Sequence, residues 1–100
     1  MLYVWSATFR PNIGREETDA ALIRRAGWQY PSGLKVHGEY WLAGSPPSPT
    51  VIVVFEADNF EPIMELDMTW GDVFDVTCVP AVTAEEGLRV GPEVMARRPA

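Results

Sequence analysis

Residues Thr50–Val82 read TVIVVFEADNFEPIMELDMTWGDVFDVTCVPAV and contain the pattern of a strand, a helix and a second strand. Thr50–Glu56 is a run of β-branched and apolar residues, which is typical of a strand. Asp58 is expected to open the helix, because its side chain can accept bonds from free backbone amides and Glu61 follows three residues later, as in a capping box. Val73–Val82 is β-rich again and predicts the second strand.

The residues before Thr50 repeat this alternation. Leu2–Phe9 (LYVWSATF) predicts a strand, and Leu34–Leu42 (LKVHGEYWL) predicts another. Between them, Arg15–Ala26 has acids near its start and arginines near its end, which complements a helix dipole. The order β-α-β-β-α-β predicts a ferredoxin-like α+β fold, in which a four-stranded antiparallel sheet carries both helices on one face.

The chain is expected to form one domain over residues 1–87, followed by a polar C-terminal tail over residues 88–100. Within that end of the chain, Ala84–Arg89 predicts a single helical turn, and the proline-bearing end after it is expected to be mobile.

Both faces of the predicted sheet are apolar. In Leu2–Phe9, Leu2 and Val4 share one face while Tyr3 and Trp5 share the other. Thr50–Glu56 has apolar side chains on both faces as well. Two helices cover only one face, so the sequence predicts a homodimer in which two sheets pack face to face. A monomer whose tail folds back over the sheet is the alternative.

Composition excludes several classes of function. The formal net charge of −6 disfavours nucleic-acid binding, which needs basic patches. No apolar run approaches the ~20 residues of a membrane span. The single cysteine allows no internal disulfide, and the start of the sequence shows no export signal, so a cytoplasmic location is expected.

Several short motifs resemble a family catalogued as a domain of unknown function, DUF3303, within the dimeric α+β barrel superfamily. The motifs are MLYVWSATF at the start, the Gly38–Trp41 segment GEYW, the Phe55–Asn59 segment FEADN, and above all WGDVFDVTCVPAV over Trp70–Val82. The chain departs from the family where Trp-His is common, because it has Tyr40–Trp41. The resemblance implies a homodimer built on facing sheets, but no particular reaction.

Two residues are candidates for catalysis. His37 is the only histidine, and its reference pKa suits a general base. Alternating side chains would place it with Lys35, Glu39 and Trp41, and a half-exposed strand histidine with a carboxylate neighbour explains it equally well. Asp72 is the second candidate, but an aspartate at this position more often bonds backbone amides in a turn.

Aromatic residues are numerous for this length, with four tryptophans, four phenylalanines and three tyrosines. Most are expected in the core or a dimer interface. Candidate ligand-binding residues are Trp41, Trp70, Tyr40 and Tyr3, which would line an apolar pocket between sheet and helices. No metal-ligand spacing is present, Cys78 has the pattern of a small buried apolar residue, and no cofactor is expected.

These observations predict a homodimeric α+β protein that binds a small apolar or aromatic molecule. One alternative is a cofactor-independent monooxygenase or isomerase acting on an aromatic substrate, with His37 or Asp72 managing a proton. Another is a structural or regulatory self-association module, which needs no pocket. The sequence leaves open whether the protein is an enzyme.

Overall fold

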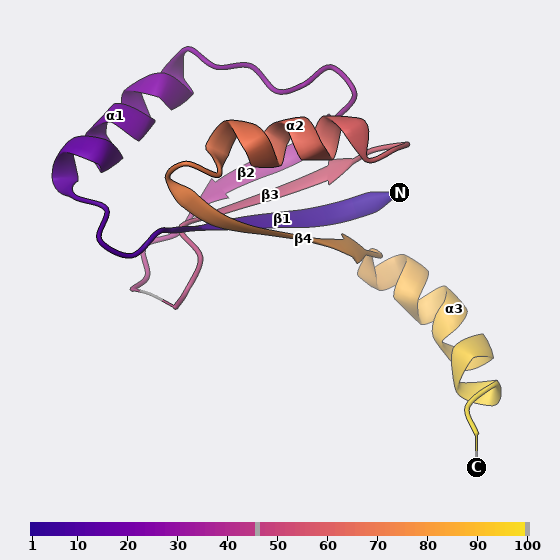
Figure 1. The fold of residues 1–100 in the computed structure, drawn as a ribbon. Helices are drawn as coiled ribbons and strands as arrows, with labels where there is room; N and C mark the ends of the chain where they lie inside the picture. The colour runs from indigo at the N-terminus through magenta and orange to yellow at the C-terminus, as the bar shows by residue number, and fades with distance from the viewer. Residues whose placement is uncertain (46, 100) are drawn as a thin grey trace.

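The computed structural model describes residues 1–45 and 47–99. Its elements follow the predicted order and add one C-terminal helix: β1 (Leu2–Phe9), α1 (Arg15–Ala26), β2 (Lys35–Trp41), β3 (Val51–Glu56), α2 (Glu61–Trp70), β4 (Phe74–Ala81) and α3 (Ala84–Ala96). The strands form one antiparallel sheet in the order β2-β3-β1-β4, and α1 and α2 lie on the same side of it (Figure 1). The ferredoxin-like α+β prediction is therefore confirmed. No helix among the described residues is long and apolar enough to cross a membrane.

The start of α2 differs from the prediction in its cap. The Oδ1 atom of Asn59 accepts the Glu61 amide at 3.1 Å, and the residue preceding the helix is Phe60. Asp58 therefore does not form the predicted capping box. Pro62 lies in the first turn, where a missing amide costs little.

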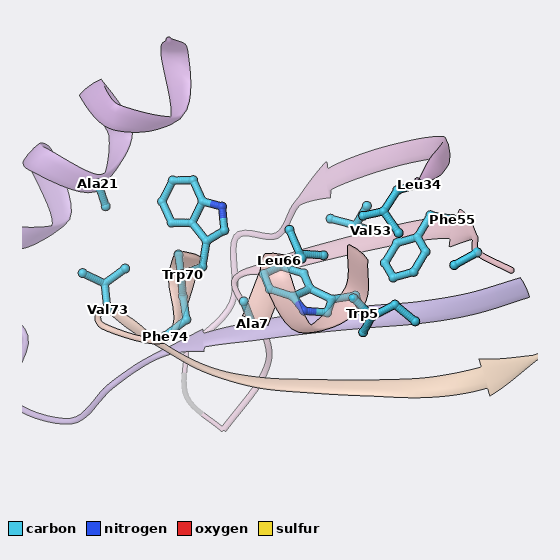
Figure 2. Close-up of a cluster of buried hydrophobic side chains, with 12 residues drawn as sticks. Trp5, Ala7, Ala21, Leu34, Val53, Phe55, Leu66, Trp70, Val73 and Phe74 are labelled. Carbon is cyan, nitrogen blue, oxygen red and sulfur yellow. The ribbon is translucent and has the colours of Figure 1, made fainter. Parts of the chain in front are cut away.

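The hydrophobic core lies between the sheet and α2. Phe55, Ile63, Leu66 and Val53 are its largest fully buried side chains. Figure 2 shows this cluster, with the ring of Trp70 standing toward α1. The Nε1 atom of buried Trp5 donates to Oδ1 of Asp67 at 2.8 Å, so the indole N–H in the core has a partner.

A β-bulge in β2 changes which side chains share a face. Val36 pairs with Phe55, and the next pair joins Gly38 to Val54, so His37 is an extra residue. The prediction that His37 shares a face with Glu39 and Trp41 is therefore wrong. After the bulge, Glu39 and Trp41 lie opposite residues of β3 whose side chains face the helices.

The second face of the sheet carries no helix or strand among the described residues (Figure 1). Apolar residues of all four strands belong to this face: Val4, Tyr40, Ile52, Val54 and Val79. These side chains are half-buried or exposed in the single chain.

The C-terminal helix α3 is longer than the predicted single turn. Thr83 caps its start with a hydroxyl that accepts the Glu86 amide at 3.1 Å, and the helix runs from Ala84 across residue 87 to Ala96. Figure 1 shows α3 projecting beyond the end of β4 instead of returning to the sheet. It contains no buried residue, so an apolar stripe that includes Leu88 and Met95 is left in contact with solvent.

Candidate ligand-binding pocket

A pocket of about 360 Å³ lies between α1 and the sheet. Ala21 is the only buried residue of α1, whereas α2 buries Pro62, Ile63, Leu66 and Trp70, so α1 covers the sheet less closely than α2 does. The walls come from α1, α2, all four strands, the segment after α1 and the connection between β2 and β3: Trp5, Phe9, Thr18, Asp19, Ala21, Leu22, Arg25, Trp28, Tyr30, Glu39, Trp41, Leu42, Thr50, Val51, Val53, Leu66, Trp70 and Phe74. The volume is in the range of small-molecule sites.

Aromatic rings make up much of the wall. Trp28 meets Trp70 edge to face, with ring centroids 5.4 Å apart, and Trp28 also contacts Tyr30 at 4.7 Å. Phe9 and Phe74 are stacked with centroids 4.7 Å apart. Because these rings also pack against one another, their positions are largely fixed before any ligand arrives.

One carboxylate organises the polar side of the pocket. Glu39 receives three hydrogen bonds from the guanidinium of Arg25, the shortest at 2.7 Å, and a fourth from the Trp41 indole at 2.7 Å. The Tyr30 hydroxyl donates to the same carboxylate. Arg25 also donates to the Trp28 carbonyl at 3.2 Å, so this cluster joins the end of α1 to β2.

The cluster fixes the protonation states of its members. Burial alone would raise the pKa of Glu39, but the hydrogen bonds from Arg25, Tyr30 and Trp41 outweigh it and hold that pKa below its usual value. Burial and the neighbouring Glu39 raise the pKa of Tyr30. Near neutral pH, Glu39 is therefore an anion whose oxygens already accept bonds, and Tyr30 is a neutral donor.

A second arginine fastens α1 at the other side of the pocket. Arg24 forms two hydrogen bonds to the carboxylate of Asp72, both at 3.0 Å, and its guanidinium lies 4.3 Å from the centre of the Trp70 ring. Arg24 thus links α1 to the turn between α2 and β4. The hydrogen bonds from Arg24 hold the pKa of Asp72 below its usual value, despite a small opposing effect of burial.

The structure separates the four candidate ligand-binding residues into two pairs. Trp41 and Trp70 both line the pocket. Tyr3 lies outside it, where its ring contacts Phe55 with centroids 5.9 Å apart. Tyr40 belongs to the uncovered face of the sheet, and its hydroxyl lies over Gly38.

Neither of the two catalytic candidates, His37 and Asp72, lines the pocket. The Nε2 atom of His37 lies 2.7 Å from Oε2 of Glu56, and Glu56 belongs to the uncovered face. Asp72 in the turn binds Arg24, while Nη1 of Arg10 lies 3.8 Å from Oδ1 of Asp75 in β4, so the two acids pair with different arginines.

Cys78 and the acids give no sign of further chemistry. Burial and the nearby Asp67 raise the pKa of the Cys78 thiol to about 11, which makes it a poor nucleophile at neutral pH. Over residues 1–45 and 47–99, no group of three or more histidine, cysteine or acidic residues is placed to hold a metal ion.

Sequence reasoning missed the Arg25–Glu39–Tyr30 cluster. From the sequence, Arg25 is expected only to complement the helix dipole at the end of α1. Strict alternation of side chains along the strand places Glu39 on the same face as His37. The available signal was a lone acid beside aromatic residues in GEYW, because a carboxylate on a half-buried strand needs donors.

The family model "Domain of unknown function (DUF3303)" matches residues 1–95. The chain therefore belongs to this family, as its sequence motifs predicted. No curated protein matches the chain.

Proposed function

We propose that the protein binds a small, largely apolar aromatic molecule in the pocket between α1 and the sheet. The observation that carries this proposal is the wall itself, in which aromatic side chains surround a cavity of about 360 Å³ and one polar cluster stands at its side. Such a combination is typical of small-molecule sites, where apolar surface gives affinity and a few polar groups orient the ligand.

The protonation states of the polar groups in the pocket favour ligand binding over acid–base catalysis. A general base must accept a proton near neutral pH. The Glu39 carboxylate has a lowered pKa and several donors, while Tyr30 has a raised pKa and remains protonated. His37 and Asp72, which the monooxygenase or isomerase alternative would use, lie outside the pocket wall.

A bulkier side chain on the pocket wall tests whether ligands bind in this pocket. Leu22 lies on the pocket wall with half of its surface exposed, so a Leu22→Trp substitution adds bulk to the cavity without disturbing a buried core position. Ile23 is its neighbour on α1, is 75% exposed and does not line the pocket, which makes Ile23→Trp a matched control.

Native mass spectrometry of the purified protein measures any retained molecule, and Nile red fluorescence reports apolar binding directly. We expect Leu22→Trp to weaken Nile red binding by about tenfold or more and to reduce the fraction carrying a retained molecule. Ile23→Trp is expected to behave like the wild type. Equal binding by wild type and both variants would show that the dye does not use this pocket and would sink the proposal.

We also propose that a second copy of the chain covers the uncovered sheet face. Four strands about 4.8 Å apart and about seven residues long present on the order of 440 Å². A stable interface buries about 800 Å² per partner. The sheet face alone therefore supplies about half of the area that a stable dimer needs.

Helix α3 supplies the rest of this area. Its 13 residues place Ala84, Leu88, Gly91 and Met95 on one apolar stripe, and the stripe of a helix this long covers about 200 Å². In a symmetric pair, each copy offers one α3 stripe and receives the other. The sheet face with two such stripes reaches the area of a standard interface, so we propose that α3 packs against the partner.

Light scattering coupled to size-exclusion chromatography tests this arrangement. Val79 lies on the uncovered face, is 53% exposed, and can become lysine without entering the core. Met68 on α2 is 73% exposed and serves as the control. We expect a dimer of about twice the chain mass for wild type and Met68→Lys, and a monomer for Val79→Lys. A wild-type protein that elutes at 11.1 kDa would refute the dimer.

A further inference from the structure

Arg25 has hydrogen-bonding capacity beyond its contacts within the protein. A guanidinium carries five N–H groups. In Arg25, Nε and one N–H of Nη2 donate hydrogen bonds to Glu39, and one N–H of Nη1 donates to the Trp28 carbonyl. Two N–H groups remain, and the Tyr30 hydroxyl interacts with the guanidinium as well, so at least one N–H has no acceptor among residues 1–45 and 47–99. Because Arg25 lines the pocket, a bound molecule can accept this bond.

The charge of Arg25 is already compensated. Glu39 is in direct contact with its guanidinium, and Asp19 adds a second carboxylate at the α1 side of the wall. A ligand carboxylate near Arg25 would gain one attraction but would be repelled by Glu39, whose side chain is only 16% exposed, and more weakly by solvent-exposed Asp19. A neutral acceptor such as a ketone oxygen gains the N–H bond without this repulsion.

A cationic ligand is disfavoured by the way the aromatic rings are used. The guanidinium of Arg24 lies over Trp70, and that of Arg25 lies 5.4 Å from the centres of both Trp28 and Tyr30. Each of these three rings therefore has one electron-rich face already occupied by an arginine, which leaves fewer faces for a ligand cation. A ligand ammonium group also has no lone pair to accept an N–H bond from Arg25, so it gains nothing from this residue.

We infer that the pocket selects neutral aromatic molecules that carry a hydrogen-bond acceptor, such as aryl ketones, over anionic and cationic aromatics of the same size. This inference rests on the proposed function and adds the chemical class of the ligand. Arg25 is its specificity-determining residue, and Glu39 sets the preference against anions.

A matched series of two-ring probes tests the inference. The four probes are naphthalene, 2-acetylnaphthalene, 2-naphthoate and 2-(aminomethyl)naphthalene at pH 7. Equilibrium dialysis with chromatographic quantitation gives each dissociation constant without optical overlap with tryptophan. We expect the ketone to bind about tenfold more tightly than naphthalene, and at least tenfold more tightly than either charged probe.

The Glu39→Gln variant should then reduce the preference for the ketone over 2-naphthoate. Removing the Glu39 charge exposes the positive charge of Arg25, so 2-naphthoate should gain at least tenfold relative to the ketone. Glu86→Gln, which removes a carboxylate from an arginine partner on the remote helix α3, should leave all ratios unchanged. Circular dichroism checks that the variants are folded, and the wild-type series decides the matter by itself if Glu39→Gln is unfolded.

The outcomes separate the two proposals. Absence of binding by all four probes would overturn the proposed function and the ligand class with it. Binding of naphthalene as tightly as the ketone would leave the pocket in place but refute the role of Arg25. Binding of 2-naphthoate as tightly as the ketone to the wild type would refute the preference for neutral molecules.

Discussion

The substitution Glu39→Gln should destabilise the protein strongly for a single-atom change. The carboxylate of Glu39 accepts from Arg25, Tyr30 and Trp41, and every one of these partners is a donor. Glutamine keeps one acceptor oxygen but turns the other into an NH₂ donor. Whichever way the amide is oriented, one set of donors faces another donor.

The magnitude follows from how deeply the pair is buried. Breaking a fully buried ion pair costs about 3–5 kcal/mol, whereas an exposed pair contributes about 0–1 kcal/mol. The exposed fractions of the Arg25 and Glu39 side chains are 31% and 16%, which places this pair between the two limits. We therefore expect a loss of about 2–3 kcal/mol and a fall in melting temperature on the order of 10–20 °C.

The loss should also depend on pH. The pKa of Glu39 in the folded protein lies below its ordinary value of 4.5, so its stabilising effect is complete above that value and is lost as the pH falls through the lowered pKa. The difference in unfolding free energy between wild type and Glu39→Gln should be largest near neutral pH. It should shrink steadily below about pH 4.5, where Glu39 takes up a proton in the unfolded chain while it is still ionised in the folded protein.

Thermal and urea unfolding monitored by circular dichroism, from pH 3.5 to 7.5, measures both effects. Glu86→Gln is the matched control, because Glu86 also pairs with an arginine but is exposed on α3, and we expect it to leave the unfolding midpoint unchanged. If Glu39→Gln melts together with Glu86→Gln at pH 7, the cluster does not hold α1 to the sheet and the argument fails.

Three further results are expected. Gly33→Ala should lower the free energy of unfolding in urea by about 1–3 kcal/mol, because the new Cβ would lie 2.9 Å from the buried Pro62 ring. Gly27→Ala, whose Cβ would meet nothing within 4 Å, should not destabilise the protein. Equal unfolding midpoints for the two variants would contradict this prediction. Cys78, with a thiol pKa of about 11, should react with iodoacetamide at pH 7.5 at least tenfold more slowly than in urea-unfolded protein, and equal rates would refute the shift. His37→Ala should leave Nile red binding unchanged, and a tenfold loss would place the histidine at the site.

The elements were predictable because their signals are local. A run such as Leu2–Phe9 needs only its own composition to indicate a strand, and the acid-to-arginine gradient of Arg15–Ala26 marks both helix ends. The cap of α2 was assigned to Asp58 although Asn59 serves, because two adjacent residues offer the same chemistry and the backbone selects one. The length of α3 was underestimated because Gly91 and Pro92 interrupt its sequence, yet the structure continues the helix through them.

The pocket was less predictable because it depends on contacts between distant segments. Trp41 and Trp70 were named from their residue type, and both reach the pocket because β2 and the end of α2 face the same space beneath α1. Tyr3 and Tyr40 were named for the same reason, their aromatic side chains, but they lie outside the pocket. The pairing register of the sheet decides which aromatic side chains reach the pocket, and a single sequence does not reveal that register.

One extra residue decides the chemistry of both faces of β2. Under strict alternation from Lys35, His37 and Glu39 would share the face away from the helices, and Arg25 would have no carboxylate to bind. The bulge leaves His37 beside Glu56 on that face and turns Glu39 and Trp41 toward α1. The only histidine is thereby kept away from the pocket, and the acid that neutralises the pocket's arginine is brought into it. The same irregularity thus favours a binding site over a histidine-dependent active site.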